Sequence, residues 1–197
     1  MKRTPIGCAA TLVLVIASLG AQQDPQPTCR NCPATYIPND EILAYLTRAK
    51  ATNTIDQQVR AVDIGKSHVA IGLVHRAKIA QPGEVAEHDL VSEVYHVISG
   101  SATLMTGPEL VGAERRPATN TNVRLLNGPG HNAKSVQNGV AHQLKAGDVM
   151  VIPAGTGHQF TKIDDHITYL MVRIDPDKVA PLKDEAASKA DLGGKKP

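Results

Sequence analysis

The stretch Gly147-Asp-Val-Met-Val-Ile-Pro153-Ala-Gly155-Thr-Gly-His158 decides the fold prediction. Two glycine-containing turns enclose a short apolar strand, Val149 to Ile152, and the second turn delivers His158 to the start of the next strand. Pro153 ends the first strand because it fixes φ and has no N–H, while Gly155 permits a tight turn. A histidine placed so rigidly is predicted to be a metal ligand or a catalytic base.

A second half-site lies upstream, in His88-Asp-Leu-Val-Ser-Glu93-Val-Tyr-His-Val-Ile-Ser-Gly100. It is rich in Val, Ile and Tyr and is predicted to be a strand that ends in a turn at Gly100. Because side chains alternate along a strand, Glu93, Tyr95 and Val97 share one face. Burying a carboxylate unpaired on such an apolar face costs several kcal/mol.

A metal ion held by His88, Glu93 and His158 would remove that cost. Two imidazoles and one carboxylate with open positions suit non-haem Fe(II), and also Zn, Mn or Ni. The sequence therefore predicts a divalent metal ion as cofactor, with its identity open.

These residues resemble the motifs of the cupin superfamily. The second cupin motif is matched from Gly147 to His158, although Lys162 stands where its trailing asparagine would be. The first motif is matched from His88 through Glu93 to Gly100. The resemblance covers roughly residues 62–173, and the second motif is fairly specific.

The resemblance implies an all-β fold, a small double-stranded β-barrel (jelly roll) with a metal near one mouth. It implies no reaction, because this fold hosts oxygenases, isomerases, lyases, binding modules and storage proteins. The first histidine of the first motif falls at Ala86. Either Glu84, Glu87 or His75 replaces it, or three ligands suffice, or the metal site has decayed.

The first 21 residues resemble a secretory signal peptide. A basic start with Lys2 and Arg3 precedes an apolar run from Ala9 to Leu19 that is short for a membrane span. A periplasmic or secreted mature chain is therefore expected. Cys29 and Cys32 would remain after cleavage, and in an exported chain they are predicted to form a small disulfide loop.

Charge excludes some classes of partner. Lys2 and Arg3 are the only charged residues of the first 21, so the mature chain carries 19 basic and 19 acidic residues. No basic face is expected for nucleic acid or for a membrane surface. The predicted partner is a small-molecule substrate, with a homodimer possible.

About 176 mature residues suffice for one domain. We expect an N-terminal arm and helix over 22–58, a cupin barrel over 59–176 and a helical or disordered tail over 177–197. The helix is predicted over Asn39–Lys50, with Asn39 as its cap and Ile42, Leu43 and Leu46 as its apolar face.

Residues 107–140 are predicted to be a long loop, rich in Asn, Gly and Pro, that could cover the barrel mouth as a lid. His131 within it would then contact substrate or carry a proton, or else face solvent. Tyr95 could act as an acid or hydrogen-bond donor near the metal, with core packing as its ordinary alternative.

Three functions remain open from the sequence. The favoured one is a metal-dependent enzyme acting on a small oxygenated molecule, as a dioxygenase with iron or as an isomerase or lyase with zinc or manganese. The others are a non-catalytic cupin that binds a sugar or organic acid, and a structural role that uses the sheet as a dimer surface.

Overall fold

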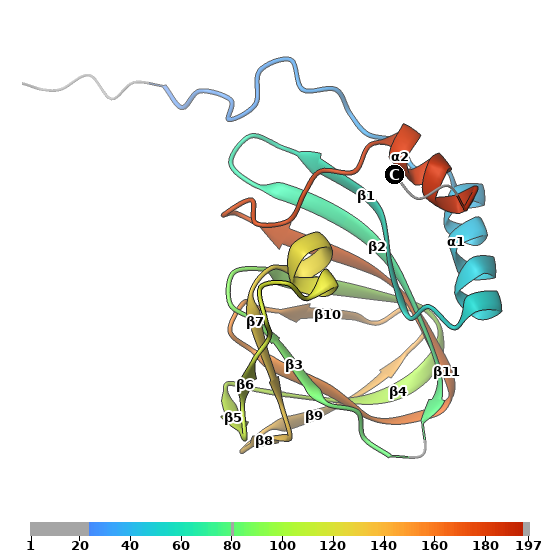
Figure 1. Cartoon of the computed structure of the whole chain (residues 1–197), viewed down its shortest axis with the longest axis vertical. Helices are drawn as coiled ribbons and strands as arrows, with labels where there is room; N and C mark the ends of the chain where they lie inside the picture. Colours follow the sequence, from blue (N-terminus) through green and yellow to red (C-terminus); the bar gives the residue numbers. More distant parts are fainter. Residues whose placement is uncertain (1–23, 80, 195–197) are drawn as a thin grey trace, which may run out of the picture.

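The computed structural model describes residues 24–79 and 81–194, and Figure 1 shows strands that curve around a barrel. Eleven strands are present in the described part of the chain. They are β1 (Asp56–Asp63), β2 (His68–Ile79), β3 (Val85–His88), β4 (Ser92–Gly107), β5 (Glu109–Val111), β6 (Glu114–Arg115), β7 (Gly130–Ala133), β8 (Ser135–Gln137), β9 (Val140–Lys145), β10 (Val149–Ile152) and β11 (Gly157–Asp175). The predicted signal peptide lies outside the described residues.

Nine of these strands form one antiparallel sheet that holds the two sequence motifs. Its order is β1-β2-β11-β3-β7-β6, and β4 adds β9, β10 and β11 as partners. β5 and β8 form a separate two-stranded sheet. The all-β prediction and the jelly-roll barrel are confirmed.

The alternation predicted for the first motif is also confirmed. Glu93, Tyr95 and Val97 are buried, whereas His96 and Ile98 on the opposite face are exposed. Tyr95 and Val97 join a core of β2, β4, β9, β10 and β11 side chains that includes Leu104, Phe160 and Tyr169. This packing places the Glu93 carboxylate inside the barrel.

The turn predicted at Gly100 is wrong. β4 runs through Gly100 without a break, and the strand predicted from His88 is instead divided, because β3 ends at His88 and β4 begins at Ser92. Gly100 has a φ of +81°, and a Cβ there would lie 1.9 Å from the carbonyl oxygen of His166. The glycine therefore serves a close approach of β4 to β11, where the strand register shifts between Ile163 and Ile167.

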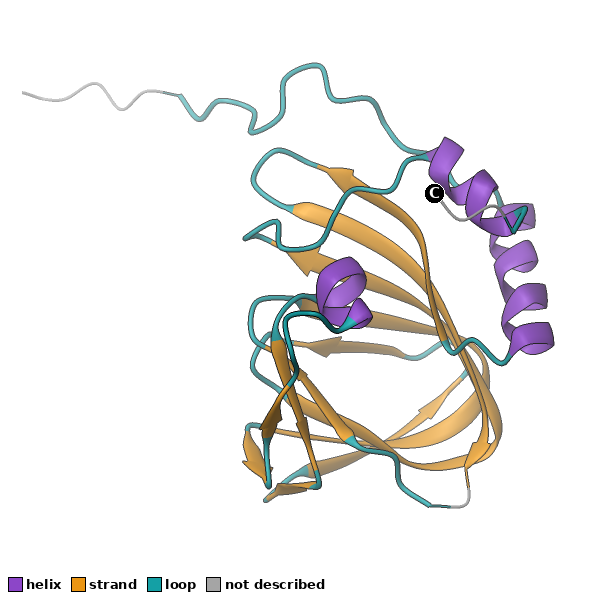
Figure 2. Cartoon of the chain, in the orientation of Figure 1, coloured by secondary structure: helices purple, strands orange, loops and turns teal. Residues whose placement is uncertain are grey.

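The long loop predicted over 107–140 is also wrong in part. It contains β5 to β8 and a single π-helical turn, η1 (Val123–Asn127). Figure 2 shows η1 beside the barrel strands and away from the two α-helices. Short strands escape prediction from sequence because two or three residues carry too little periodicity to detect.

The predicted N-terminal helix is α1 (Asn39–Thr52), two residues longer than expected. Pro38 occupies the cap position, so Asn39 is not the cap. The apolar face is also shifted, because Leu43 is 48% exposed while Tyr45 and Ala49 are buried. Ile42 and Leu46 do pack against the small cluster formed by Tyr45, Val59 and Leu73, as a helix lying on β1 and β2 requires.

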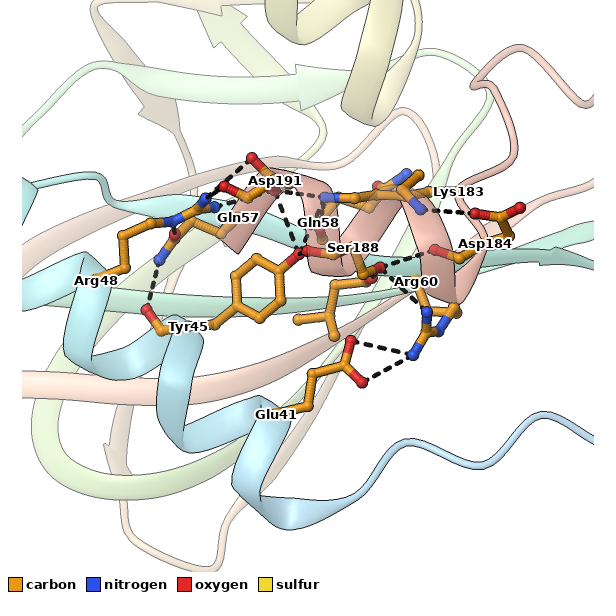
Figure 3. Close-up of polar contacts among 12 residues, drawn as sticks. Glu41, Tyr45, Arg48, Gln57, Gln58, Arg60, Lys183, Asp184, Ser188 and Asp191 are labelled. Carbon is orange, nitrogen blue, oxygen red and sulfur yellow. Dashed lines mark hydrogen bonds and ion pairs between the residues drawn. The ribbon is translucent and has the colours of Figure 1, made fainter. Parts of the chain in front are cut away.

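The tail folds as helix α2 (Glu185–Leu192) and packs on α1 through polar contacts (Figure 3). Asp191 accepts hydrogen bonds from Arg48 and from Lys183, and the Tyr45 hydroxyl donates to it at 3.2 Å. Ser188, which is fully buried, donates to the carbonyl oxygen of Val59 in β1. These contacts fix α1, whose C-terminal end leads directly into the wall of the barrel cavity.

Cys29 and Cys32 form the predicted disulfide in the N-terminal arm. Among the described residues, no helix is both long and apolar enough to cross a membrane.

Candidate metal centre

Three side chains predicted to bind metal converge inside the barrel. His88 comes from the end of β3, Glu93 from β4 and His158 from the start of β11. One ligand atom from each lies within 4.8 Å of the other two. All three side chains are buried. The sequence therefore identified three residues that the fold brings together from distant strands.

Protein groups compensate the buried charge of Glu93, in addition to any metal that its position would allow. Arg173 Nε donates to Glu93 Oε1 at 3.3 Å, and the Tyr95 hydroxyl donates to Oε2 at 2.8 Å. Burial alone would raise the pKa of Glu93, but His88, Arg173 and His158 hold it well below its usual range. The carboxylate is thus ionised and paired without a metal.

Arg173 is the main site residue that the sequence analysis missed. It lies directly across from Glu93 in the β4–β11 register and is 1% exposed. A detectable signal existed, because Arg173 shares its strand face with Tyr169 and Met171, as Glu93 does with Tyr95 and Val97. Two opposite charges on apolar faces of neighbouring strands predict a buried pair.

His158 is oriented as a metal ligand. Its Nδ1 lies 3.1 Å from the carbonyl oxygen of Thr156, and because a carbonyl only accepts, Nδ1 carries the proton. Nε2 is therefore unprotonated, and its lone pair is available to a metal. This atom lies 3.6 Å from Glu93 Oε2. Burial lowers the pKa of His158 to about 4, which keeps the ring neutral at neutral pH. Two acceptors facing each other at this distance fit a cation between them.

His88 is oriented differently. Arg116 Nη2 lies 3.0 Å from His88 Nδ1, and because a guanidinium only donates, Nδ1 accepts. The neutral ring then carries its proton on Nε2, which lies 3.4 Å from Glu93 Oε1. A metal bound at Nε2 would need the proton on Nδ1 instead. The donor set therefore fits a metal through His158 and Glu93, and through His88 once Arg116 moves away.

Ala86 lies at the cavity, beside His158 in the β3–β11 register. Of the three alternatives for the missing histidine, only Glu84 lines this cavity. Glu84 accepts a hydrogen bond from Asn132 Nδ2 at 2.9 Å. His75 bonds to Thr168, and Glu87 bonds to His131, so neither joins the cluster.

The two predicted catalytic residues occupy different places. The Tyr95 hydroxyl contacts Glu93, its ring stacks on Tyr169 with centroids 4.3 Å apart, and burial together with the charge of Glu93 raises its pKa well above the usual value. Tyr95 is therefore a hydrogen-bond donor to Glu93 rather than a ready proton source. His131 pairs with Glu87 and Asp89 and does not line the cavity.

The cavity above the cluster has a volume of about 470 Å³. Its lining includes the segment from Asn53 to Asp56, where α1 leads into β1, and residues of the 107–140 region. Its lining is rich in amides, namely Asn53, Asn120, Asn122, Asn127 and Asn132. Arg76 and Arg116 also line it. Such a lining suits a small, polar, oxygen-rich molecule.

Residues 132–194 match the family described as AraC-like ligand-binding domain. They include the whole second motif, and the barrel brings it against the first motif. The barrel fold is the one that the resemblance to the cupin superfamily implied. No curated protein sequence matches the chain.

Solved structures similar to this chain are remote in sequence. A Bacillus halodurans protein shares 14% identity over 81% of this chain and 97% of its own, with a TM-score of 0.43. A Cupin 2 conserved barrel domain protein from Salinispora arenicola shares 15% over 72% and 83%, with a TM-score of 0.36. The DMSP lyase DddQ from Ruegeria pomeroyi shares 17% over 62% and 51%, with a TM-score of 0.35. These similarities assign no ligand or reaction to this chain.

Proposed function

We propose that this cupin is a metal-dependent enzyme acting on a small oxygenated molecule. The observation that carries the proposal is the convergence of His88, Glu93 and His158 at the base of an open polar cavity. The metal would supply Lewis-acid chemistry, or with iron would also bring O2 and substrate together.

The chain's own residues would bind and orient the substrate. Arg76 and the amides of the lining offer charge and hydrogen bonds to its oxygens. Tyr95 and Arg173 hold the Glu93 carboxylate in place through hydrogen bonds to its two oxygens. Catalysis by positioning of this kind requires ligands that do not have to rearrange during the reaction.

One observation favours a second candidate, a cupin that binds a small molecule without catalysis. Because Arg173 and Tyr95 already compensate Glu93, the fold does not need a metal to bury it. The match of residues 132–194 to an AraC-like ligand-binding domain also agrees with a binding role.

Metal content separates the two candidates. We would purify the chain without chelator and measure bound metals by mass spectrometry in the wild type, in His158→Gln and in His142→Gln. His142 is a partly exposed histidine of β9 that contacts Thr106, so it is the matched control. Near-stoichiometric metal that is lost only in His158→Gln would support the enzyme.

The metal then selects the reaction class. Iron predicts O2 uptake with oxygen-rich substrates such as catechols, flavonols and diketones, whereas zinc or manganese predicts isomerisation or elimination. Absence of metal from the wild type, even after incubation with Fe(II), Mn(II) and Zn(II), would contradict the enzyme and leave the binding role.

The expected export signal and the possible homodimer remain proposals of their own. A cleaved N-terminus on the exported protein, found by mass spectrometry, and the mass in solution would test them.

A further inference from the structure

Arg116 lines the cavity and makes hydrogen bonds through both its backbone and its side chain. It follows β6, is 9% exposed, and its backbone N–H donates to the carbonyl oxygen of Gly130 at 3.0 Å. Its Nη2 donates to the carbonyl oxygen of Glu87 and to His88 Nδ1. Its Nε–H is buried and has no hydrogen-bond partner among the described residues.

Three other residues that line this cavity also carry a buried polar atom without a partner in the described part of the chain. One of them is Asp56, whose Oδ1 is unpaired. Asn127, which is 7% exposed, has a buried amide oxygen without a partner, and Arg76 has a buried Nε without one. Buried polar groups are nearly always paired, because each unpaired one costs about 1–3 kcal/mol. Four such atoms, two acceptors and two donors, on residues around one cavity indicate a ligand that supplies the missing partners.

The charges identify the class of ligand. Arg76 and Arg116 line the cavity, and so do Asp56, Glu84 and Glu93. Arg173 neutralises part of the acidic charge by contacting both Asp56 and Glu93. Adding a divalent cation at the His88–Glu93–His158 cluster makes the cavity positive, so an anionic ligand is favoured.

We propose that Arg116 binds a carboxylate group of the substrate, and that this binding frees His88 for the metal. The second half of the proposal rests on the proposed metal-dependent function. An arginine binds a carboxylate in a fork through Nε–H and one Nη2–H. The Nε–H of Arg116 is free, but both Nη2 hydrogens are engaged, by Glu87 and by His88.

One of those two contacts must therefore yield to the carboxylate. We infer that the contact to His88 yields, because Glu87 contributes a backbone carbonyl that β3 holds in place, whereas His88 contributes a side chain. The proton of the neutral His88 ring can then sit on Nδ1. Nε2 is left unprotonated, with its lone pair available to a metal beside Glu93 and His158. Carboxylate and metal would consequently strengthen each other's binding by the same factor.

A merely structural Arg116 would behave differently. Its contacts to Gly130 and Glu87 tie β6 and β7 to β3, and their loss would loosen the cluster and weaken metal binding. Under our proposal, removing Arg116 releases His88 and strengthens metal binding in the absence of any carboxylate. The sign of this change separates the two roles.

The experiment uses succinate as the carboxylate probe and inorganic phosphate as the competing anion. Calorimetric titrations of the metal-stripped full chain would compare the wild type, Arg116→Gln and Arg115→Gln. Arg115 is the matched control, because it is the adjacent arginine but is exposed and pairs with Asp89 at 2.6 Å. We expect Arg116→Gln to weaken succinate binding at least tenfold, Arg115→Gln to leave it unchanged, and phosphate to bind more weakly than succinate.

A second titration, with Mn(II), measures the coupling. Succinate should tighten Mn(II) binding to the wild type by a factor within about 5–150-fold. It should leave Arg116→Gln unaffected, and this variant also corrects for direct chelation of the metal by succinate. Without succinate, Arg116→Gln should bind Mn(II) more tightly than the wild type, provided its circular dichroism spectrum shows the native fold.

Succinate binding that survives Arg116→Gln, or phosphate binding tighter than succinate, would overturn the carboxylate subsite. Weaker Mn(II) binding by a folded Arg116→Gln variant would overturn the release of His88. If the wild type binds no metal under any condition while its succinate binding depends on Arg116, the metal-dependent function fails and the carboxylate subsite stands.

Discussion

The two histidines of the cluster are positioned by different kinds of contact. His158 follows a turn, and the backbone carbonyl of Thr156 fixes its ring in the orientation that presents Nε2 to Glu93. His88 ends β3, and its ring is held by the side chain of Arg116, which donates to Nδ1. A backbone contact is set by the fold, whereas side-chain contacts can be exchanged for contacts with a ligand. The metal-binding orientation of His158 is therefore preformed. The orientation of His88 can change when a ligand replaces its side-chain contacts.

The largest effect is expected at Arg173, which holds the carboxylate that lies beside both histidines. Arg173→Met leaves Glu93 buried without its cationic partner, so the free energy of unfolding should fall by about 3–5 kcal/mol. Urea denaturation of the variant and the wild type measures this difference in the free energy of unfolding. Lys162→Met, which breaks the exposed pair with Asp164, should change stability little. Equal stability of Arg173→Met and the wild type would mean that Glu93 needs no protein cation.

Metal affinity tests the comparison directly. His158→Ala should weaken Mn(II) binding by more than about 100-fold, the upper range for losing an outer partner of a ligand. His88→Ala should cost less, because the wild-type His88 must first leave Arg116. Calorimetric titration compares both variants with His142→Ala. Equal losses at His88 and His158 would show that the two orientations are equally preformed.

Substitutions at two glycines, one in each sequence motif, test how the backbone of that motif depends on glycine. Gly147, in the second motif, has a φ of +92°, and a Cβ added there would meet nothing within 4 Å, so Gly147→Ala should cost about 1–2 kcal/mol from φ alone. Gly100→Ala adds a 1.9 Å contact with the His166 carbonyl and should cost distinctly more. Thermal unfolding of the two variants gives the difference. A smaller loss at Gly100 would contradict the close approach of β4 to β11.

The smallest effect concerns the helices beyond the cavity wall. Burial opposes ionisation of Asp191, but Arg48 and Lys183 outweigh it and lower its pKa from 3.8 to about 2. Since the folded-state pKa is the lower one, this stabilisation is complete above about pH 4 and is lost as the pH falls toward 2. Asp191→Asn should therefore lower the melting temperature at pH 7 and match the wild type near pH 2. Asp177→Asn, at an exposed carboxylate outside this network, is the control, and a constant difference at all pH values would contradict the assignment.

The sequence predicted what depends on local pattern. The turn residues Pro153 and Gly155 indicated the position of His158, and alternation placed Glu93, Tyr95 and Val97 inside. Gly100 misled the prediction because a glycine that permits a close approach between strands has the same signature as one that makes a turn. Only the three-dimensional register distinguishes them.

What sequence could not supply is the set of partners brought in from elsewhere. Arg116 contacts His88 across 28 residues and Arg173 contacts Glu93 across 80, so neither contact follows from spacing. The sequence analysis named a metal ion as the group that would offset the burial of Glu93, and it did not foresee a protein cation in that role. Arg173 meets the same electrostatic requirement from the neighbouring strand.

β11 has a further consequence for the whole barrel. His158 and Arg173 lie 15 positions apart on this one strand, a contour of roughly 50 Å at about 3.3 Å per residue, yet both side chains reach the same carboxylate of Glu93. The strand must therefore coil around the molecule until its two ends meet across a single acidic group. A ligand bound beside Glu93 would hold the two ends of β11 together. Even a ligand only a few atoms across would therefore slow hydrogen exchange along the entire length of β11.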